Sequence, residues 1–377
     1  MTEKEYLREK KSLYDYVNGL QYNDRFCATD RRFNIVSASL KYMLPNLNFS
    51  DHKKIYKNLF HYHKVNQLDL AFKNSIEFCE FENYTQEINQ HIQAKPLIIT
   101  TFHFGSYRMI HHFLRKKAVS YVLLTAKSVY ETDLERCKEF NDGNECKHEH
   151  CMNVIDIEAD NAIFQMLKSI KSGKSIVVYL DGNTGLNYLL QAGAGLMTIK
   201  LLGKDIEVRK DIAYVSHVAD VPVLNVVSFV QWQGKTVLRF HPMVYPNEKL
   251  SRDDYSIFLL QKVFNQFGKT LKQFPDQWEA WFYIYKSMGK RVKMNKPIST
   301  SKRVFLVNEK YYFNIEEFGM YKVNENFYLL NKNTFLPCLI SAELYSFLLK
   351  YIGGRKLIDC LKTGFISDLA EKRILIN

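Results

Sequence analysis

The chain has 377 residues, of which 46% are hydrophobic, so it can bury a substantial core and does not have a disordered protein's composition. Its net charge of +12 is spread along the sequence and favours anionic partners, although a Lys-rich solubilising surface would give the same total. No basic stripe with interleaved aromatic residues predicts nucleic-acid binding. No apolar run approaches the roughly 20 residues of a membrane span, and the polar start MTEKEYLREKK predicts no signal peptide. We therefore expect a cytoplasmic protein, peripheral to the inner membrane if its basic surface meets lipid.

The first 93 residues have a helical pattern. Ile35–Leu44 predicts a helix that ends before Pro45, and Ser50 can cap a second helix with apolar residues three or four apart up to Phe72. From residue 96 the pattern changes, because short apolar runs alternate with amphipathic segments. The runs predicted as strands are Leu97–Thr101, Val119–Thr125, Val154–Ile157, Ser175–Leu180, Met197–Leu202, Val221–Val230 and Val237–His241. Helices are predicted between them at Met109–Leu114, Ala162–Lys171 and Ile212–Val218, which indicates an α/β fold with a mostly parallel sheet flanked by helices.

A further helix is predicted to begin after Ser251, and a Lys- and Arg-rich linker follows at residues 286–303. Beyond it, strand-like runs precede helical ones, which predicts a small α+β, winged-helix-like domain over 304–377. The runs are Val304–Val307, Gly319–Val323 and Asn326–Leu330, then Ala342–Tyr351, Leu357–Lys362 and Ile366–Arg373, with Pro337 breaking the segment before the first helix. The predicted organisation is an N-terminal helical part (1–95), an α/β core (96–285), the linker and this domain.

His103 and Asp181 each follow a predicted strand. Ligands of open α/β sheets bind outside the carboxyl ends of the strands, so both side chains are candidates for one site. A histidine there can take a proton from an attacking hydroxyl or amine, although a histidine before a helix is more often structural. Gly105 and Ser106 form the corner after it. This corner would allow close approach of a substrate or another backbone, and the first amides of the following helix could hold an oxyanion.

These segments resemble the lipid A biosynthesis acyltransferases of the lysophospholipid acyltransferase superfamily over residues 30–290. The resembling segments are, in order, LKYMLPNLNFSDHKKIYKNLF, AKPLIITTFHFGSY, VVYLDGNTG, GLMTIKLLGKDIEVRKDIAYVSHVADVPVLNVV and FPDQWEAWFYIYK. The resemblance implies that His103 is the general base of an H-x4-D/E motif, acting on an acceptor that attacks an acyl thioester. It implies acyl carrier protein or CoA as the acyl carrier and no bound cofactor.

The acid of that motif is replaced here by Arg108, which cannot accept a hydrogen bond from the imidazole. Two readings follow. In the first, another carboxylate supplies the missing acid, with Asp181 the better candidate and Glu207 the other. In the second, the fold serves binding or another reaction, and Arg108 holds an anion such as phosphate or carboxylate. Arg209 and Lys210 match basic or small positions that the family has near the acceptor, but they also suit a solvated helix start.

Trp278 and Trp281 suit core packing better than a membrane-interface anchor. Five potential zinc ligands, Cys137, Cys146, His148, His150 and Cys151, lie close together, but their spacing fits no known finger and suits an exposed loop as well, so we expect no metal site.

The segment NENFYLLNKNTFLPCLISAELYSFLLKYIGGRKLIDCLKTGFISDLAEKRILI resembles the PqqD-like peptide-recognition fold. This resemblance implies that a leader peptide binds the C-terminal domain while the core of the same ribosomal peptide is acylated at His103. Two alternatives remain: a peripheral lipid acyltransferase that touches anionic membrane, and an inactive acyltransferase fold that binds a peptide or carrier protein.

Overall fold

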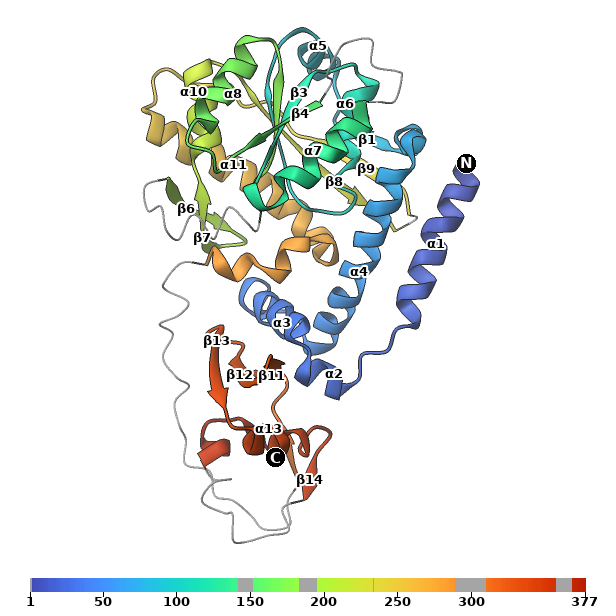
Figure 1. Ribbon diagram of the computed structural model, residues 1–377, viewed down its shortest axis with the longest axis vertical. Coiled ribbons are helices and arrows are strands. Elements are labelled where there is room, and N and C mark those ends of the chain that lie inside the picture. The colour runs from blue at the N-terminus through green and yellow to red at the C-terminus, as the bar shows by residue number, and fades with distance from the viewer. Residues whose placement is uncertain (1, 142–151, 183–194, 233, 289–309, 357–367) are drawn as a thin grey trace. The chain divides into compact units, whose positions relative to one another are not determined.

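The computed structural model describes residues 2–141, 152–182, 195–232, 234–288, 310–356 and 368–377 (Figure 1). The chain divides into two compact units. The larger unit contains residues 1–17 and 58–280, and the smaller unit contains residues 18–57 and 281–377. This division differs from the predicted one, which placed residues 18–57 in an N-terminal helical part spanning 1–95.

The larger unit alternates helices with strands through most of its length. Its helices are α1 (Glu3–Gly19), α4 (Phe49–Ala71, which crosses the boundary at residue 58), η1 (Lys73–Phe78), α5 (Gln86–Ala94), α6 (Met109–Lys116), α7 (Lys127–Asn141), α8 (Ala162–Lys171), α10 (Asp211–Ala219), α11 (Arg252–Gln273), η2 (Pro275–Gln277) and η3 (Glu279–Phe282). Its strands are β1 (Glu80–Glu82), β2 (Ile98–Thr101), β3 (Tyr121–Thr125), β4 (Met152–Asp156), β5 (Ser175–Tyr179), β6 (Leu196–Leu201), β7 (Lys204–Arg209), β8 (Val223–Val230) and β9 (Thr236–Phe240).

Seven of these strands form one sheet in the order β1-β9-β8-β2-β5-β3-β4. The five strands from β8 to β4 are parallel to their neighbours, whereas β9 runs antiparallel to β8 and parallel to β1. The predicted α/β class with a mostly parallel sheet is therefore confirmed. The first 93 residues are not all helical, because Glu80–Glu82 pairs with β9 as an edge strand.

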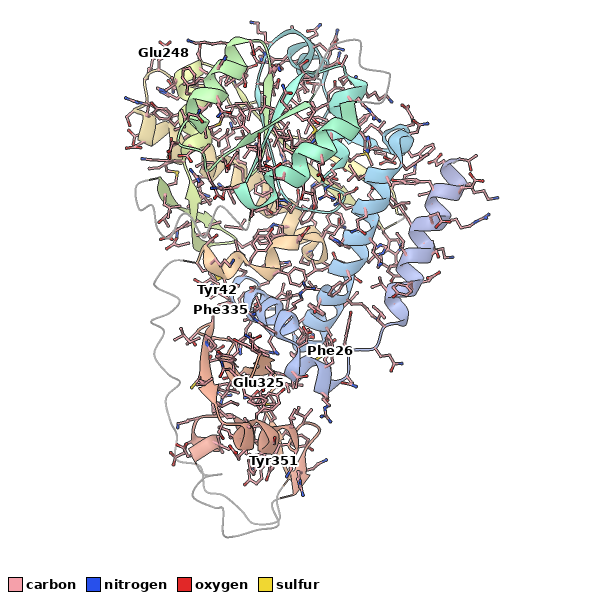
Figure 2. All side chains as sticks on the ribbon, in the orientation of Figure 1. Phe26, Tyr42, Glu248, Glu325, Phe335 and Tyr351 are labelled. Carbon is pink, nitrogen blue, oxygen red and sulfur yellow. The ribbon has the colours of Figure 1, made fainter. Side chains whose placement is uncertain are left out.

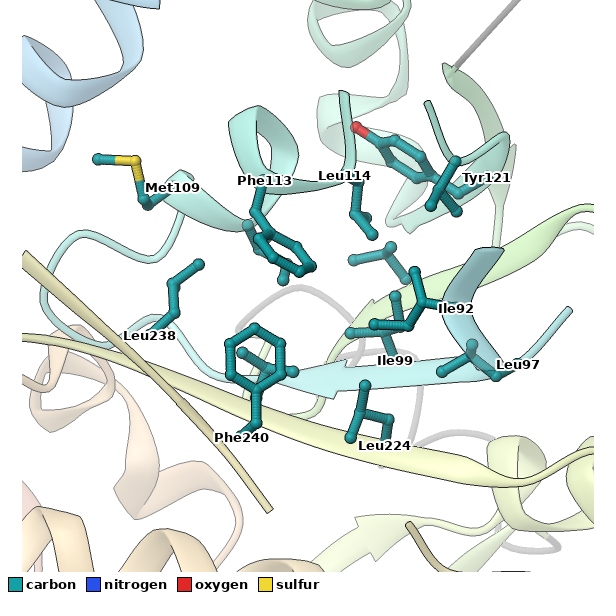
Figure 3. Close-up of a cluster of buried hydrophobic side chains, with 14 of the residues drawn as sticks. Ile92, Leu97, Ile99, Met109, Phe113, Leu114, Tyr121, Leu224, Leu238 and Phe240 are labelled. Carbon is teal, nitrogen blue, oxygen red and sulfur yellow. The ribbon is translucent and has the colours of Figure 1, made fainter. Parts of the chain in front are cut away.

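Side chains from both faces of the sheet are buried. On one face, Met109, Phe113 and Leu114 of α6 pack over strands that carry Ile99 and Phe240 (Figure 3). On the other face α11 contributes the core; for example, the Phe102 and Phe267 rings stack with their centroids 3.8 Å apart. Helical cover on both faces explains why the strand sequences are almost continuously apolar.

A two-stranded hairpin lies outside the main sheet. The predicted strand Met197–Leu202 is β6, and it pairs antiparallel with β7, which was not predicted. Leu202 and Gly203 both have positive φ angles of 54° and 81°, the backbone that a tight two-residue hairpin turn requires. The predicted strand Met197–Leu202 is therefore followed by a hairpin turn and a second strand before the next helix.

The smaller unit combines helices from near the N-terminus with strands from the C-terminal region. Its elements are α2 (Asp24–Thr29), α3 (Arg31–Met43), η4 (Ile284–Lys286), β10 (Lys310–Phe313), β11 (Phe318–Val323), β12 (Asn326–Asn331), β13 (Leu336–Ile340), α13 (Ala342–Leu349), β14 (Arg355–Lys356) and β15 (Leu375–Ile376). The strands form two small antiparallel sheets, β11-β12-β13 and β14-β10-β15.

Close packing inside the smaller unit explains why it includes residues 18–57. Gly319 on β11 lies against Asn34 of α3, and a Cβ atom at that glycine would overlap the asparagine side chain. Tyr42 and Phe335, both labelled in Figure 2, contact edge to face with ring centroids 6.4 Å apart. The C-terminal strands therefore share a core with α2 and α3.

Two sequence-based details are corrected. Asn48, not Ser50, caps α4, because Asn48 and Asp51 exchange backbone-to-side-chain hydrogen bonds of 3.0 Å. Pro337 does not break the chain, because it lies in β13 at an edge of the β11-β12-β13 sheet, where a residue without an N–H is tolerated. Most of the predicted linker, the strand Val304–Val307, the helix Leu357–Lys362 and the start of Ile366–Arg373 fall outside the described residues.

None of the helices in the described ranges is long and apolar enough to cross a membrane.

Candidate active site

His103 and Asp181 meet because their strands are parallel neighbours in register. Thr101 of β2 lies opposite Tyr179 of β5, and each candidate residue follows two positions later. Parallel strands are about 4.8 Å apart, so matched positions beyond their carboxyl ends are adjacent. His103 Nδ1 and Asp181 Oδ1 are 2.8 Å apart. We call these two residues the dyad.

Asp181 is held by three donors and its side chain is only 1% exposed. The backbone N–H of His103 donates to both carboxylate oxygens at 3.1 and 3.0 Å, and Trp278 Nε1 donates to Oδ2 at 2.7 Å. These hydrogen bonds fix the carboxylate in orientation, with Oδ1 facing the His103 ring. The carboxylate therefore places the proton of the neutral imidazole on Nδ1 and leaves Nε2 as the basic nitrogen.

The His103 ring packs against two tyrosine rings, but 23% of its side chain is exposed. It stacks on Tyr179 at a centroid distance of 4.6 Å and meets the edge of Tyr107 at 4.9 Å. Within the described residues, Nε2 forms no hydrogen bond. Burial alone would lower the pKa of His103, but the charge and hydrogen bond of Asp181, assisted by Glu279, outweigh burial and Arg108, so the pKa is raised.

A second histidine, His111, contacts one of these tyrosines, Tyr179. Both ring nitrogens of His111 contact tyrosine hydroxyls: Nδ1 lies 2.9 Å from Tyr121 and Nε2 lies 3.0 Å from Tyr179. Burial, together with the charges of His112 and Arg108, lowers the pKa of His111 to about 3. His111 is therefore neutral near pH 7 and serves to orient Tyr179 under the His103 ring.

The close approach that Gly105 permits is made here by protein, one of the two partners predicted for this corner. Gly105 has a φ of +56°, and a Cβ atom there would lie 2.8 Å from both the Phe229 backbone and Gln277 Oε1. Its N–H donates to the carbonyl of Gln277 at 2.9 Å, so it is not free to hold an oxyanion. The next two amides, of Ser106 and Tyr107, have no acceptor among the described residues and take over as candidate oxyanion donors.

The FPDQWE segment fixes this corner. Gln277 exchanges two side-chain hydrogen bonds with the backbone of Val230 at 2.8 and 2.7 Å, and the N–H of Glu279 donates to the His103 carbonyl at 3.0 Å. Trp278 and Trp281 are both fully buried, as expected of core residues, and Trp278 additionally donates to Asp181.

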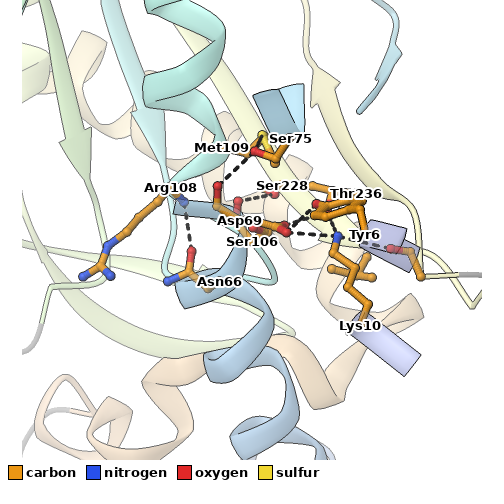
Figure 4. Close-up of polar contacts among 12 residues, drawn as sticks. Tyr6, Lys10, Asn66, Asp69, Ser75, Ser106, Arg108, Met109, Ser228 and Thr236 are labelled. Atoms are coloured by element: carbon orange, nitrogen blue, oxygen red, sulfur yellow. Dashed lines mark hydrogen bonds and ion pairs between the residues drawn. The ribbon is translucent and has the colours of Figure 1, made fainter. Parts of the chain in front are cut away.

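Arg108 begins the turn into α6 beside the dyad. Its backbone N–H donates to Asn66 Oδ1 at 3.2 Å (Figure 4). Its guanidinium lies over the Tyr107 ring, 5.4 Å from the ring centroid. Among the described residues no carboxylate pairs with that guanidinium. Ser106 is fully buried, its carbonyl accepts from Ser228 Oγ at 2.8 Å, and its own hydroxyl has no partner.

The remaining basic candidates, Arg209 and Lys210, form ion pairs with neighbouring acids. Arg209 pairs with Asp211 at 2.5 Å, and Lys210, at the start of α10, pairs with Asp253 at 2.8 Å. In the part of the chain that the structure describes, neither contacts the dyad. Glu207, the alternative acid, lies in β7 opposite Thr198 and does not contact His103 either.

A second buried polar cluster has a structural role. Lys10 Nζ lies 3.2 Å from Asp69 Oδ1 and donates to Thr236 Oγ1 at 2.7 Å, while Tyr6 also donates to Asp69 (Figure 4). Lys10 and Asp69 are 3% and 0% exposed. The pair joins α1 to α4 and β9.

The cysteine and histidine cluster near Cys137–Cys151 lies outside the residues whose side chains are described. Within the described ranges, no group of three or more His, Cys, Asp or Glu side chains could hold a metal ion.

Three contributors to the site were not predicted: Gln277, Asn66 and the indole of Trp278 as a donor. The motif resemblance at FPDQWE could have pointed to Gln277 and Trp278. Asn66 lies on a helix whose local sequence gives no sign of a site.

No family model matches the chain, and no curated protein matches it. Among solved structures it is similar to the 1-acyl-sn-glycerophosphate acyltransferase PlsC from Thermotoga maritima, at 13% identity and a TM-score of 0.35, over 64% of this chain and 95% of that one. It is also similar to the pilus retraction motor PilT with bound ADP, at 10% identity and a TM-score of 0.27, over 57% of this chain and 67% of that one. Scores this low for two proteins of different activity carry no functional argument.

Proposed function

We propose that the chain is an acyltransferase in which His103 is the general base and Asp181 orients it. The observation that carries this proposal is the 2.8 Å contact between His103 Nδ1 and the buried Asp181 carboxylate, which leaves Nε2 basic. The order of motifs resembling the lipid A acyltransferases supports the choice of acyl transfer. Asp181 would then replace the acid that the H-x4-D/E motif lacks here.

In the proposed reaction, Nε2 takes the proton from an acceptor hydroxyl or amine as that atom attacks the acyl carbonyl of a thioester. A new C–O or C–N bond forms and the C–S bond breaks. The imidazolium returns its proton to the departing thiolate. The amides of Ser106 and Tyr107 would stabilise the oxyanion, and the carrier would be acyl carrier protein or CoA.

The test is thiol release from acyl-CoA and acyl carrier protein, with His103→Ala and Asp181→Asn compared with His63→Ala, an exposed histidine of the same unit. His103→Ala should abolish turnover. Asp181→Asn should lower kcat by roughly 10³–10⁴, as loss of an orienting carboxylate does elsewhere. Full activity of His103→Ala would refute the mechanism.

The pH profile provides a second readout. His103 acts as a base only when neutral and its pKa is raised, so activity should fall as the pH falls through that pKa. Asp181→Asn removes the main group that raises the His103 pKa, so the fall in its residual activity should move to a lower pH. If the fall stays at the same pH, a group other than His103 causes it.

For the acceptor, we propose a ribosomal peptide recognised by the C-terminal sheet. Supporting this, β13 is an edge strand with exposed Leu336 and Leu339, so an extended peptide could add to it. Deletion of the C-terminal residues is a poor test, because β11 shares a core with α3. Instead, Leu339→Asp should reduce the mass shift of a co-expressed precursor peptide while leaving thiol release intact.

The two alternatives give different outcomes in the same assays. A lipid acyltransferase would acylate a lysophospholipid in vesicles, and Leu339→Asp would have no effect. A binding protein would retain the peptide or carrier with no product in either the parent protein or His103→Ala.

A further inference from the structure

The start of α6, beside the dyad, is rich in hydrogen-bond donors and poor in acceptors. The donors are the guanidinium of Arg108, the side-chain NH₂ of Asn66 and the backbone N–H groups of Ser106 and Tyr107. We call this group the Arg108 corner.

Asn66 supplies the evidence that the corner is incomplete. The residue is fully buried on α4, its Oδ1 accepts from the Arg108 N–H at 3.2 Å, and its Nδ2 has no partner. Figure 4 shows this nitrogen and the Arg108 side chain extending to the same side of the hydrogen bond that joins the two residues. An unpartnered buried donor is destabilising, and an acceptor group bound there would remove that penalty.

Arg108 lacks the counter-charge that a half-buried guanidinium normally has. Within the described residues no acid forms an ion pair with it, whereas Arg209 and Arg239 of the same unit pair with Asp211 and Glu82. The hydroxyl of Ser106, which is fully buried, also has no partner. An oxyanion bound at the corner would supply the acceptor that Asn66 Nδ2 lacks and the counter-charge that Arg108 lacks.

We propose that the Arg108 corner binds an oxyanion group, carboxylate or phosphate, carried by the acceptor substrate. The identification of the anion's carrier as the acceptor substrate rests on the proposed function, whereas the anion site itself rests on the geometry. Arg108 would hold the anion, and Asn66 would position it. The attacking hydroxyl or amine of the same molecule would then lie within reach of His103 across the Tyr107 ring, which contacts both residues.

Binding of an anion at the Arg108 corner should change the pKa of His103. The charged groups that act on this imidazole are Asp181 and Glu279, which raise its pKa, and Arg108, which lowers it. A bound anion neutralises Arg108, so it should move the His103 titration to higher pH without any turnover.

The experiment is an NMR pH titration of the protein labelled with ¹³C at the histidine ring, with His103 assigned by His103→Gln. Titrations are recorded alone, with inorganic phosphate and with acetate. We expect the His103 midpoint to rise with one or both anions and to saturate with concentration. A response to phosphate only identifies a phosphate-bearing acceptor, and a response to acetate only identifies a carboxylate.

Variants then assign the site. Arg108→Ala should raise the His103 midpoint without any anion and weaken anion binding roughly tenfold or more, the value of a charge-assisted hydrogen bond. Arg108→Lys should retain part of the binding, and Asn66→Ala should weaken it less. The matched control is Arg115→Ala, because Arg115 is on the same helix but contacts His112 at 3.3 Å.

No anion effect in the parent protein, or an equal effect in Arg108→Ala, would overturn the inference. The outcomes distinguish this inference from the proposed function. Turnover without anion binding would refute only the anion site at the Arg108 corner, and anion binding without turnover would refute only the acyltransferase activity.

Discussion

Lys332 is a fully buried cation in the smaller unit, and its ionisation should control that unit's stability. Its Nζ donates to the Ile315 carbonyl at 2.7 Å and to Ser37 Oγ at 3.3 Å, and it lies 5.3 and 5.2 Å from the ring centroids of Phe33 and Phe49. No carboxylate pairs with it among the described residues. Burial lowers the pKa of Lys332 from 10.5 to about 7.

The sign of the pH dependence follows from this lowered pKa. Between about pH 7 and 10.5 the unfolded chain binds a proton at Lys332 that the folded chain does not, so the free energy of unfolding rises with pH. The cost of the buried charge is present in full below pH 7 and disappears near pH 10.5. With about 1.4 kcal/mol per pKa unit, the gain between about pH 6.5 and 8.5 is about 2 kcal/mol.

The perturbation is Lys332→Met, which keeps an apolar side chain of similar length and removes the titrating group. Urea denaturation at the two pH values should show the gain of about 2 kcal/mol in the parent protein and its loss in Lys332→Met. The control is Lys322→Met, because Lys322 lies on β11 of the same unit and is 46% exposed. Parallel pH dependence in the parent protein and Lys332→Met would refute the argument.

Three further substitutions test the fold. Gly105→Ala should destabilise the larger unit by at least about 2 kcal/mol in urea denaturation, because φ is +56° and the new Cβ meets the β8 backbone; unchanged stability would mean the corner can shift. Asp69→Ala should lower the free energy of unfolding by about 3–5 kcal/mol, because it leaves the Lys10 charge buried and unpaired. Replacing both Lys10 and Asp69 with apolar residues should restore most of that stability, as measured by thermal unfolding. Ser251→Ala removes the cap on the Asp254 N–H and should cost about 1 kcal/mol, and a loss below a few tenths would show that α11 does not depend on it.

The local sequence determined most of the secondary structure of the larger unit. Apolar runs with Ile and Val mark β2, β5 and β8, and Ser251 caps α11 as expected, because these signals act within a few residues. Short or half-buried strands were missed: β1 has three residues, and β7 carries alternating charges that resemble a loop.

Local sequence also located His103, since a histidine directly after a buried strand must lie at the sheet edge. It favoured Asp181 as the acid but could not exclude Glu207, because that choice depends on which strands are neighbours. The sheet places β5 directly beside β2 and leaves β7 in a separate hairpin, so Asp181 reaches His103.

The tertiary structure alone decided the contacts between segments distant in sequence. Asn66 meets Arg108 across 42 positions, Trp278 meets Asp181 across 97, and Lys332 meets Ser37 across 295. Such pairs leave no local periodicity or spacing in the sequence, because folding rather than the chain brings them together. For the same reason, only the structure shows that residues 18–57 and the C-terminal strands form one unit.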